Sequence, residues 1–252
     1  MGHIGVERAL VLLRYIADQE DGLSIREVSR ELGMSTPVVQ NIIEAMKAQG
    51  FVEKNKSNDR YYFGPEAIHL GFSVLSKLDI RQTSRAHLEA LCKETGETVF
   101  LGILSGDKAV YIDKVVSEQM IRIDARFGAT RPLNCTAVGK ALLAHQQPEV
   151  IQEIFDAGAF EKRTENSIMD PYKLQDELKK IRDQGWSFDD EEFMQEACCI
   201  AAPIRDGGGV VIAALSISAP ASRVRGRETE IIEQVKRHAK GISGNLGYIE
   251  KE

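Results

Sequence analysis

The chain has 252 residues, 43% of them hydrophobic and 28% charged, which is the balance of an ordinary globular protein with room for one large domain or two smaller ones. Its longest apolar runs, such as 210–215, are too short to span a bilayer, and its first residues carry no cationic, apolar signal, so we expect a cytoplasmic protein without membrane partners. The four cysteines lack CxxC spacing and are expected to be reduced thiols, and no pattern indicates a metal or a cofactor.

The N-terminal sequence predicts three helices. The first covers 6–19. Its buried face is expected to consist of Ala9, Leu10, Leu13, Ile16 and Ala17. The second begins after Ser24, the expected N-cap, and Glu27 lies three residues later, as in a reciprocal capping box. Gly33 then permits a sharp turn, and a third helix covers 36–49. Two helices joined by a short turn that contains glycine form a helix-turn-helix.

Two short strands follow the third helix. Residues 51–54 and 61–63 are expected to pair around the polar tip 55–60. A helix-turn-helix followed by such a hairpin is a winged helix-turn-helix, a module that usually reads DNA. We assign residues 1–64 to this domain.

A linker helix is expected at 65–79, because Pro65 suits the first turn of a helix. Its apolar residues are Ile68, Leu70, Phe72, Val74, Leu75 and Leu78. This is more apolar surface than a solvated linker exposes, so we expect it to pack against another part of the protein or a second subunit. The domain boundary is placed near 75–80.

Residues 80–252 are expected to form a second domain, with helices around one sheet. The expected helices are 80–94, 136–144, 148–157, 171–184 and 226–246. The expected strands are 98–104, 109–112, 119–125, 186–188, 196–204 and 210–218. The first two strands form a hairpin, 119–125 is a half-buried strand by its alternation, and a loop through Gly128 and Pro132 follows it. The predicted fold class is α+β with two domains.

The exposed side of the third helix carries candidate base-reading residues. Gln40 and Asn41 can each form two hydrogen bonds with adenine, and Ser35 and Thr36 can reach phosphates. The candidate DNA contacts are Arg26, Ser35, Thr36, Pro37, Gln40, Asn41, Glu44, Lys54, Lys56 and Arg60. Residues 1–76 nevertheless contain 8 Lys or Arg against 10 Asp or Glu, a net charge of −2, whereas DNA binding usually needs a basic surface. The alternative is that these positions are simply solvated.

Parity places Ala214, Ser216 and Ser218 on one face of the last strand, opposite Leu215 and Ile217. The serine hydroxyls either line a polar pocket or face solvent, and the pattern alone leaves both open.

Other chemical motifs are weaker. Residues 189–192 are four consecutive acids, which we expect to form a solvated turn because four neighbours cannot all point inward. Cys198 and Cys199 are expected to be buried structural residues. Gly139 and Lys140 lack the spacing of a phosphate-binding loop, and no spacing supports a cysteine nucleophile with a histidine. We expect no enzymatic activity.

Nine short segments, in this order, carry a resemblance to a known family. They are RAL at 8–10, GMS at 33–35, YFG at 62–64, LG at 70–71, TGETV at 95–99, GKALLA at 139–144, GWSFDDEE at 185–192, CIAAPI at 199–204 and SIS at 216–218. Over essentially its whole length the chain resembles the IclR family of bacterial transcriptional regulators.

The resemblance implies a winged-helix DNA-binding domain, a linker helix and a GAF-like domain that binds a small effector. It also implies dimers through the N-terminal domains, often paired into tetramers. Carried over position by position, it implies effector contacts at Ala137, Val138, Asp189, Cys199, Ser216 and Ser218, which favours the pocket over the solvent face for the two serines.

Two departures from the family pattern stand out. No Lys or Arg occurs between Ser35 and Met46, where the family commonly has basic residues, so operator affinity and target sequence are expected to differ. Asn134 replaces a frequent histidine, and we expect this exchange to alter effector choice.

The sequence thus predicts a transcriptional regulator that binds operator DNA and responds to an effector, with repression or activation left open. The alternatives are a small-molecule sensor that has lost DNA binding and acts through protein contacts, and a cysteine-dependent enzyme. The effector is expected to be a small hydroxy- or keto-carboxylate or an aromatic acid. Its carboxylate is expected near Ala137, Val138 and Ser216, because a helix N-terminus attracts negative charge.

Overall fold

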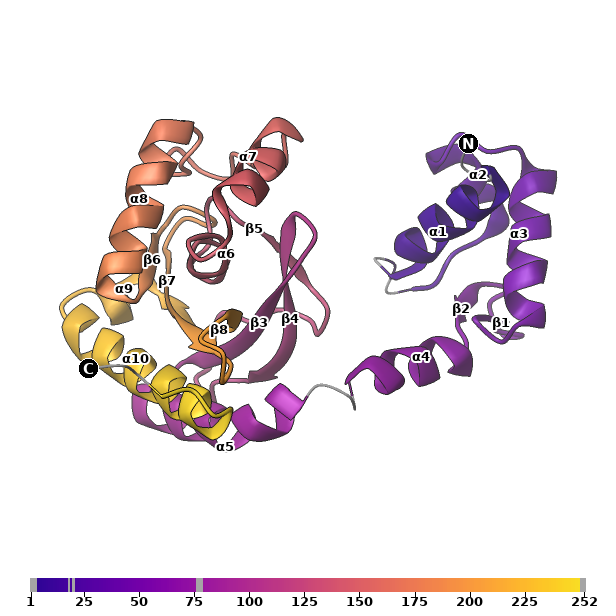
Figure 1. Cartoon of the computed structure of the whole chain (residues 1–252). Coiled ribbons are helices and arrows are strands. Elements are labelled where there is room, and N and C mark those ends of the chain that lie inside the picture. The colour runs from indigo at the N-terminus through magenta and orange to yellow at the C-terminus, as the bar shows by residue number, and fades with distance from the viewer. Residues whose placement is uncertain (1–3, 18, 20, 76–78, 250–252) are drawn as a thin grey trace. The chain divides into compact units, whose positions relative to one another are not determined.

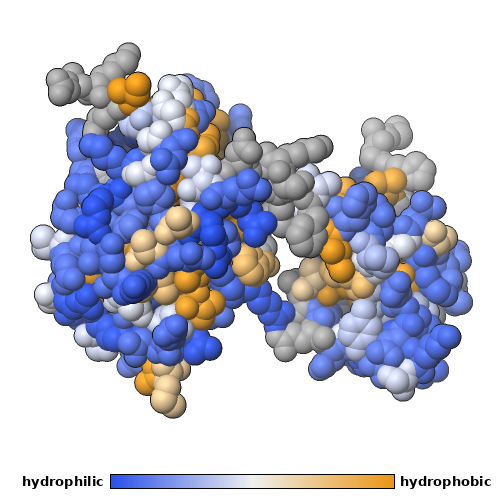
Figure 2. Space-filling model, turned by 90° about the horizontal axis from the view of Figure 1, so that it is seen from below, coloured by the Kyte–Doolittle hydropathy of each residue, from blue (hydrophilic) through white to orange (hydrophobic). Residues whose placement is uncertain are grey.

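The computed structural model describes all residues except 1–3, 18, 20, 76–78 and 250–252. The chain forms two compact units, Met1–Leu78 and Asp79–Glu252, which are described separately (Figure 1). None of the helices in the described part of the chain is long and apolar enough to cross a bilayer. On the face shown in Figure 2, hydrophilic residues predominate and hydrophobic residues form small groups.

The N-terminal unit is the predicted winged helix-turn-helix. It contains α1 (Ile4–Ala17), α2 (Ile25–Glu31), α3 (Thr36–Ala48), β1 (Val52–Lys54) and β2 (Tyr61–Phe63). The two strands pair antiparallel, and Leu23 adds a bridge to Tyr61. The predicted capping box is present, since Ser24 Oγ accepts from the Glu27 amide and the Glu27 carboxylate accepts from the Ser24 amide.

The core of this unit corrects the predicted face of α1. The buried residues are Leu12, Ile16, Leu23, Val28, Val39, Ile43, Met46, Val52 and Tyr61. Leu10 and Ala17 were predicted to be buried and are exposed, whereas Leu12 is fully buried. Residues 9–13 are apolar throughout, so periodicity alone leaves the rotation of the helix ambiguous, and packing against α3 and β2 decides it.

Helix α4 (Pro65–Leu75) follows β2 in the same unit. Ile68 and Leu70 on this helix are 60% and 53% exposed. Of the other apolar residues predicted here, Leu78 and the side chains of Phe72, Val74 and Leu75 lie outside the described part of the structure.

The second unit is built on a six-stranded antiparallel sheet. Its strands are β3 (Thr98–Ser105), β4 (Lys108–Val115), β5 (Thr130–Pro132), β6 (Ser187–Asp190), β7 (Ala197–Arg205) and β8 (Val211–Pro220). Their order across the sheet is β5-β4-β3-β8-β7-β6. The predicted hairpin turn between β3 and β4 lies at residues 106 and 107, and Gly106 supplies its positive φ of 60°.

Helices lie on both faces of this curled sheet (Figure 1). Helices α5 (Asp79–Thr95) and α10 (Glu228–Asn245) lie side by side on one face. Helix α6 (Ala137–Leu143) packs against every strand on the other face, with α7 (Pro148–Asp156) and α8 (Pro171–Gln184) outside it. A short helix, α9 (Ala221–Val224), follows β8. The predicted α+β class is confirmed.

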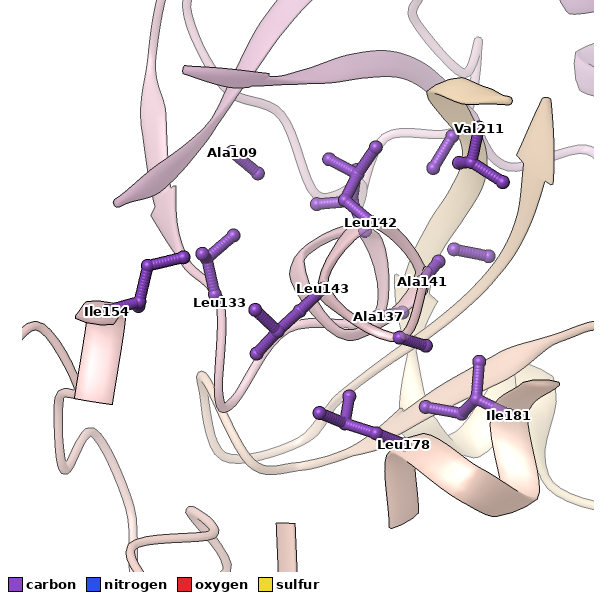
Figure 3. Close-up of a cluster of buried hydrophobic side chains, with 14 of the residues drawn as sticks. Ala109, Leu133, Ala137, Ala141, Leu142, Leu143, Ile154, Leu178, Ile181 and Val211 are labelled. Carbon is purple, nitrogen blue, oxygen red and sulfur yellow. The ribbon is translucent and has the colours of Figure 1, made fainter. Parts of the chain in front are cut away.

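Helix α6 is the centre of the core of this unit. Figure 3 shows its side chains pointing in several directions, with Leu178 and Ile181 of α8 on one side and Leu133 on another. Two glycines permit this close packing. A Cβ on Gly102 would lie 2.6 Å from Val138 Cγ2, and a Cβ on Gly139 would lie 2.5 Å from the Pro132 carbonyl oxygen.

Three elements differ from the prediction. Residues 119–125 form no strand, and β4 pairs instead with the short strand β5 through residues 108–110. The alternating sequence pattern belongs to a segment outside the sheet, in which Ile123 and Ala125 are partly buried and Met120 is 96% exposed. The predicted loop through Pro132 contains the short strand β5, and the short helix α9 was not predicted.

Candidate functional site

Strand register aligns polar side chains across three strands of the second unit. Asp189 of β6 pairs with Cys199 of β7, which pairs with Ser218 of β8. Ser216 lies two residues earlier in β8 and therefore points to the same face, beside Phe100 of β3. The sheet thus places these groups on the face that α6 covers.

A cavity of about 150 Å³ lies at this point, between the sheet and the N-terminal end of α6. Its walls include all the effector residues implied by the resemblance: Ala137, Val138, Asp189, Cys199, Ser216 and Ser218. Ser216 and Ser218 are 1% and 3% exposed, so the alternative of a solvent-facing serine pair is wrong.

The N-terminal end of α6 is fixed by its cap. Thr136 Oγ1 accepts a hydrogen bond from the Gly139 amide at 3.1 Å and donates to the Pro132 carbonyl at 2.6 Å. The amides of Ala137 and Val138 come first in the helix and have no intrahelical acceptor. Their residues line the cavity, so the cap orients two backbone donors at its wall.

The two serine hydroxyls differ in their partners. Ser218 Oγ lies 3.1 Å from Cys199 Sγ, within hydrogen-bonding distance. Ser216 Oγ is buried and has no hydrogen-bond partner. An unpaired buried hydroxyl is unfavourable by about 1–3 kcal/mol, and a ligand in the cavity can provide its partner.

Asp189 corrects the prediction of a solvated acidic turn. It is 2% exposed, and Oδ1 accepts hydrogen bonds from the amides of Glu192 (2.8 Å) and Phe193 (3.2 Å). Burial, reinforced by the negative charge of Glu192, raises the pKa of Asp189 to about 7. Glu192 is also buried, whereas Asp190 and Glu191 pair with Arg225, so the first and last of the four acids are buried and the middle two lie nearer the surface.

Lys140 is a buried cation, a role that the sequence did not predict. It was considered only as part of a phosphate-binding loop, which the spacing excludes. It is 1% exposed, and its Nζ forms an ion pair with Glu192, lies 3.7 Å from a Glu177 oxygen and donates to the Phe188 carbonyl at 2.5 Å. A lysine within the apolar run 139–144 requires buried partners, and that is the sequence signal that points to this cluster.

Arg131 on β5 also lines the cavity and was not predicted to do so. Its guanidinium carbon lies 5.2 Å from the Tyr111 ring centroid and 5.0 Å from that of Phe193. The sequence predicted a loop at this position, and a loop does not indicate which way a side chain points, so Arg131 was not identified as a cavity residue.

Asn134 does not line the cavity. Its Nδ2 donates to the carbonyls of Glu161 (3.0 Å) and Ile168 (2.9 Å), and its Oδ1 accepts from the Glu161 amide. The side chain therefore holds the 161–168 segment in place, and nothing in its contacts supports the expectation that it selects the effector directly.

The cysteines lack the character of nucleophiles. All four are free thiols, and burial raises the pKa of Cys135 and Cys198 to about 12 and that of Cys199 well above its ordinary value. Burial also lowers the pKa of His145 to about 4. Reactive thiols need a lowered pKa, so the geometry argues against a cysteine-dependent enzyme. Among the described residues, no group of three His, Cys, Asp or Glu is placed to hold a metal ion.

A larger, more open depression of about 950 Å³ lies between α7 and α8. Apolar residues such as Ile151, Phe155, Phe160 and Leu174 form much of its wall. It contains none of the predicted effector residues. We therefore regard the smaller cavity, where buried polar groups converge, as the candidate ligand site.

The N-terminal unit presents the candidate DNA surface. Ser35, Thr36, Pro37, Gln40, Asn41 and Glu44 are all exposed at the start and along one side of α3. Ser29 Oγ donates to the Met34 carbonyl at 2.6 Å and lies 3.3 Å from Thr36 Oγ1, which fixes the turn before α3. Glu44 is paired with Lys47 at 3.4 Å.

The predicted phosphate contacts divide into two groups. Arg60 pairs with Glu27 at 2.7 Å and donates to the Gly22 carbonyl, and Lys54 pairs with Asp59 at 2.6 Å. Arg26 and Lys56 are exposed and form no ion pair with a described residue. The first two are therefore engaged within the unit, and the last two are available to a partner.

Two family descriptions match the chain, one in each unit. The IclR helix-turn-helix domain matches residues 5–56, and the bacterial transcriptional regulator IclR C-terminal domain matches residues 72–244. The chain is 31% identical to the HTH-type transcriptional regulator XynR of Escherichia coli, over 96% of this chain and 97% of XynR. It is 33% identical to the regulator KdgR of the same organism, over 91% of this chain and 88% of KdgR.

A solved structure shows the same fold. The crystal structure of the Thermotoga maritima IclR is similar to this chain with a TM-score of 0.76 and 34% sequence identity. The alignment covers 98% of this chain and all of that one.

Proposed function

Because the chain belongs to the IclR family of bacterial transcriptional regulators, we propose that it binds operator DNA and that a small organic acid in the α6 cavity modulates this binding. The observation that carries the effector half of the proposal is the Ser216 hydroxyl, which is buried in the cavity wall without a partner. The family relationship and the winged helix-turn-helix support the DNA half.

In the DNA-bound state, α3 lies in the major groove and the wing reaches the flanking backbone. Gln40 and Asn41 provide amides suited to adenine, so A·T pairs dominate each half-site. Arg26 and Lys56 contact phosphates. The protein acts as a homodimer and reads a pseudo-palindrome with half-sites separated by whole helical turns.

Asn41→Ala tests whether α3 reads the bases. We expect this variant to lose roughly 1–3 kcal/mol of binding free energy at one base pair of each half-site and to lose discrimination there. Fluorescence anisotropy with the DNA upstream of the protein's own gene, and with single-base variants of it, measures both quantities. Gln49→Ala, an exposed change just beyond the end of α3, is the matched control. Unchanged affinity and sequence preference in Asn41→Ala would show that another surface reads the DNA.

The effector half is tested by the same assay with added ligands. Titration with hydroxy-, keto- and aromatic acids is expected to shift the DNA affinity of the wild type, whereas neutral compounds of similar size are expected to leave it unchanged. Ser216→Ala is expected to weaken the response about tenfold, since a hydrogen bond from ligand to hydroxyl contributes about 1 kcal/mol or more. Ser105→Ala, an exposed serine at the end of β3, is the control. An equal response of Ser216→Ala and wild type would contradict the assignment of the cavity.

The alternative of a sensor that has lost DNA binding rests on the absence of Lys and Arg between Ser35 and Met46. The relatives that match along the whole chain are transcriptional regulators, which favours DNA binding. A wild-type protein that retards no DNA at low salt would restore the alternative.

A further inference from the structure

Three charged side chains line the α6 cavity. Two of them, Asp124 and Asp189, are paired with a cation or accept hydrogen bonds from backbone amides. Asp124 accepts from Lys114 Nζ at 2.6 Å and from the Ala125 amide at 2.7 Å. Asp189 accepts from two backbone amides. Arg131 donates from Nη1 to the Thr130 carbonyl at 2.9 Å, and no carboxylate of a described residue lies within 4.0 Å of it. Among the described lining residues, Arg131 is therefore a cation without a counter-ion.

The guanidinium of Arg131 is held by aromatic rings. It stacks against Tyr111 of β4 and against Phe193, which follows β6. Tyr111 in turn stacks on Phe100 of β3, with ring centroids 4.3 Å apart. Aromatic faces attract the cation but do not neutralise it, and they restrict its rotation. The guanidinium is thus fixed at the cavity, where its hydrogen bonds to the Thr130 carbonyl and to the Tyr111 side chain leave further N–H donors for a ligand.

The stack also forms part of the cavity wall. Arg131 lies on β5, at one edge of the sheet, whereas Phe193 comes from the segment after β6, the strand at the opposite edge. Their contact connects the two edges across the curled face, beside the cavity that contains Ser216. A ligand inside therefore meets a fixed cation on one wall and an unpaired hydroxyl on another.

We propose that Arg131 is the residue that selects an anionic ligand for this cavity, its guanidinium binding the carboxylate of a small acid while Ser216 bonds an oxygen elsewhere on the ligand. This inference rests on the proposed effector function of the cavity. It revises the expected pose, in which the carboxylate lay at the start of α6, because a whole uncompensated charge attracts an anion more strongly than the partial charges of backbone amides. A cavity of about 150 Å³ suits a small ligand.

The test compares each acid with its neutral amide, which has nearly the same shape. Calorimetry of the full chain with glycolate, lactate and pyruvate, and with glycolamide, lactamide and pyruvamide, measures the preference for the charge. We expect the wild type to bind at least one acid tighter than its amide by on the order of tenfold to a hundredfold. Arg131→Gln is expected to lose this preference, and Arg131→Lys to retain part of it.

Arg163→Gln is the matched control. Arg163 stacks on the same Phe193 ring, at 4.9 Å from its centroid, but does not line the cavity, so its replacement is expected to leave the preference for acids intact. Ser216→Ala is expected to weaken acid and amide by the same factor. Thermal unfolding of each variant establishes that it folds, and Arg131→Lys decides the question if Arg131→Gln does not.

The outcomes separate this inference from the proposed function. If Arg131→Gln keeps the wild-type preference for acids, Arg131 is not the selecting residue, although the cavity remains an effector site. If the wild type binds acid and amide equally, or binds only the amides, the cavity selects no anion and the inference fails while effector binding stands. Binding of neither class overturns the inference, and the DNA titration with larger ligands then decides the proposed function by itself.

Discussion

Lys140 is a charged residue at the centre of an otherwise apolar helix, and its neighbours explain how it is tolerated. Its ammonium group joins α6 to Glu192 and to the Phe188 carbonyl, next to Asp189 in the cavity wall. A buried charge is stable only when paired and hydrogen-bonded. Lys140 is thus a positioning residue that connects α6 with the segment that carries Asp189 and Phe193.

Removing Lys140 leaves Glu192 buried and uncompensated. We expect Lys140→Met to lower the free energy of unfolding by roughly 3–5 kcal/mol, the usual effect of removing one partner of a buried pair. Glu192→Gln in the same chain should recover part of this loss, because it removes the remaining charge. Urea denaturation of the single and double variants measures both effects, and a Lys140→Met protein as stable as the wild type would show that the pair is not required.

Asp189 gives stability a pH dependence of known sign. Its pKa is raised to about 7 in the folded protein by burial, against 3.8 for an ordinary aspartate. Between these two values the folded state retains a proton that the unfolded state releases, so this group's contribution to stability falls as pH rises from about 4 to 7. The whole decrease is at most about 4 kcal/mol.

Asp189→Asn removes this titration while keeping an oxygen for the two backbone amides. We expect the stability difference between variant and wild type to move in favour of the variant as pH rises from 4.5 to 7.5. Glu192 and Lys140 face the same carboxyl, and both are unchanged in the variant, so the comparison isolates Asp189. Parallel pH profiles for the two proteins would contradict the raised pKa.

At the scale of elements, the wing and α2 form one structure. The Arg60 side chain extends from the wing to Glu27 on α2 and to the carbonyl of Gly22, while Lys56 at the tip forms no ion pair with a described residue. Two basic residues four positions apart therefore have different roles, one holding the unit together and the other open to a phosphate.

Replacing each with alanine distinguishes these roles. Lys56→Ala is expected to weaken binding to all DNA sequences alike and to reduce the slope of log affinity against log salt by about 0.9, the value for one phosphate contact. Arg60→Ala is expected instead to lower the unfolding temperature of the N-terminal unit. Anisotropy at several salt concentrations and thermal denaturation measure the two effects. A reduced salt slope in Arg60→Ala without loss of stability would show that this arginine also contacts DNA.

At the scale of the whole molecule, the N-terminal unit exposes apolar side chains on two helices. They are Ile4, Val6, Leu10 and Val11 on α1, and Ile68 and Leu70 on α4. Apolar side chains gathered on a small domain favour a protein interface, which agrees with the proposed dimer.

Ile68→Asp tests this interface. Burying an isoleucine contributes about 1.5–3 kcal/mol, so we expect the charged variant to weaken dimerisation by at least tenfold. Val210→Asp, at a residue 62% exposed in the second unit, is the control and is expected to leave the dimer intact. Sedimentation velocity at micromolar concentrations measures both, and an unchanged dimer in Ile68→Asp would place the interface elsewhere.

Short-range signals in the sequence determined most of the elements. The capping box at Ser24, the cap and bounds of α8, and the turn between β3 and β4 depend on residues within one turn of each other, so they could be predicted locally. Strand parity likewise placed Ser216 and Ser218 on one face, because alternation is a property of the extended chain itself.

The tertiary structure determined which face of each element is buried and which charged side chains pair with one another. Residues 119–125 alternate like a strand but join no strand of the sheet, and α1 takes its rotation from α3 and β2. Asp189 is buried in β6, where it pairs with Cys199 of β7 on the face that α6 covers, and Arg131 lies between the rings of Tyr111 on β4 and Phe193. The sequence alone predicted the family, most of the elements and the shared face of the two serines, and the resemblance already implied Asp189 as an effector contact. Burial and pairing depend on residues distant along the chain, so only the folded structure showed that Arg131 lines the cavity and that Lys140 pairs with Glu192.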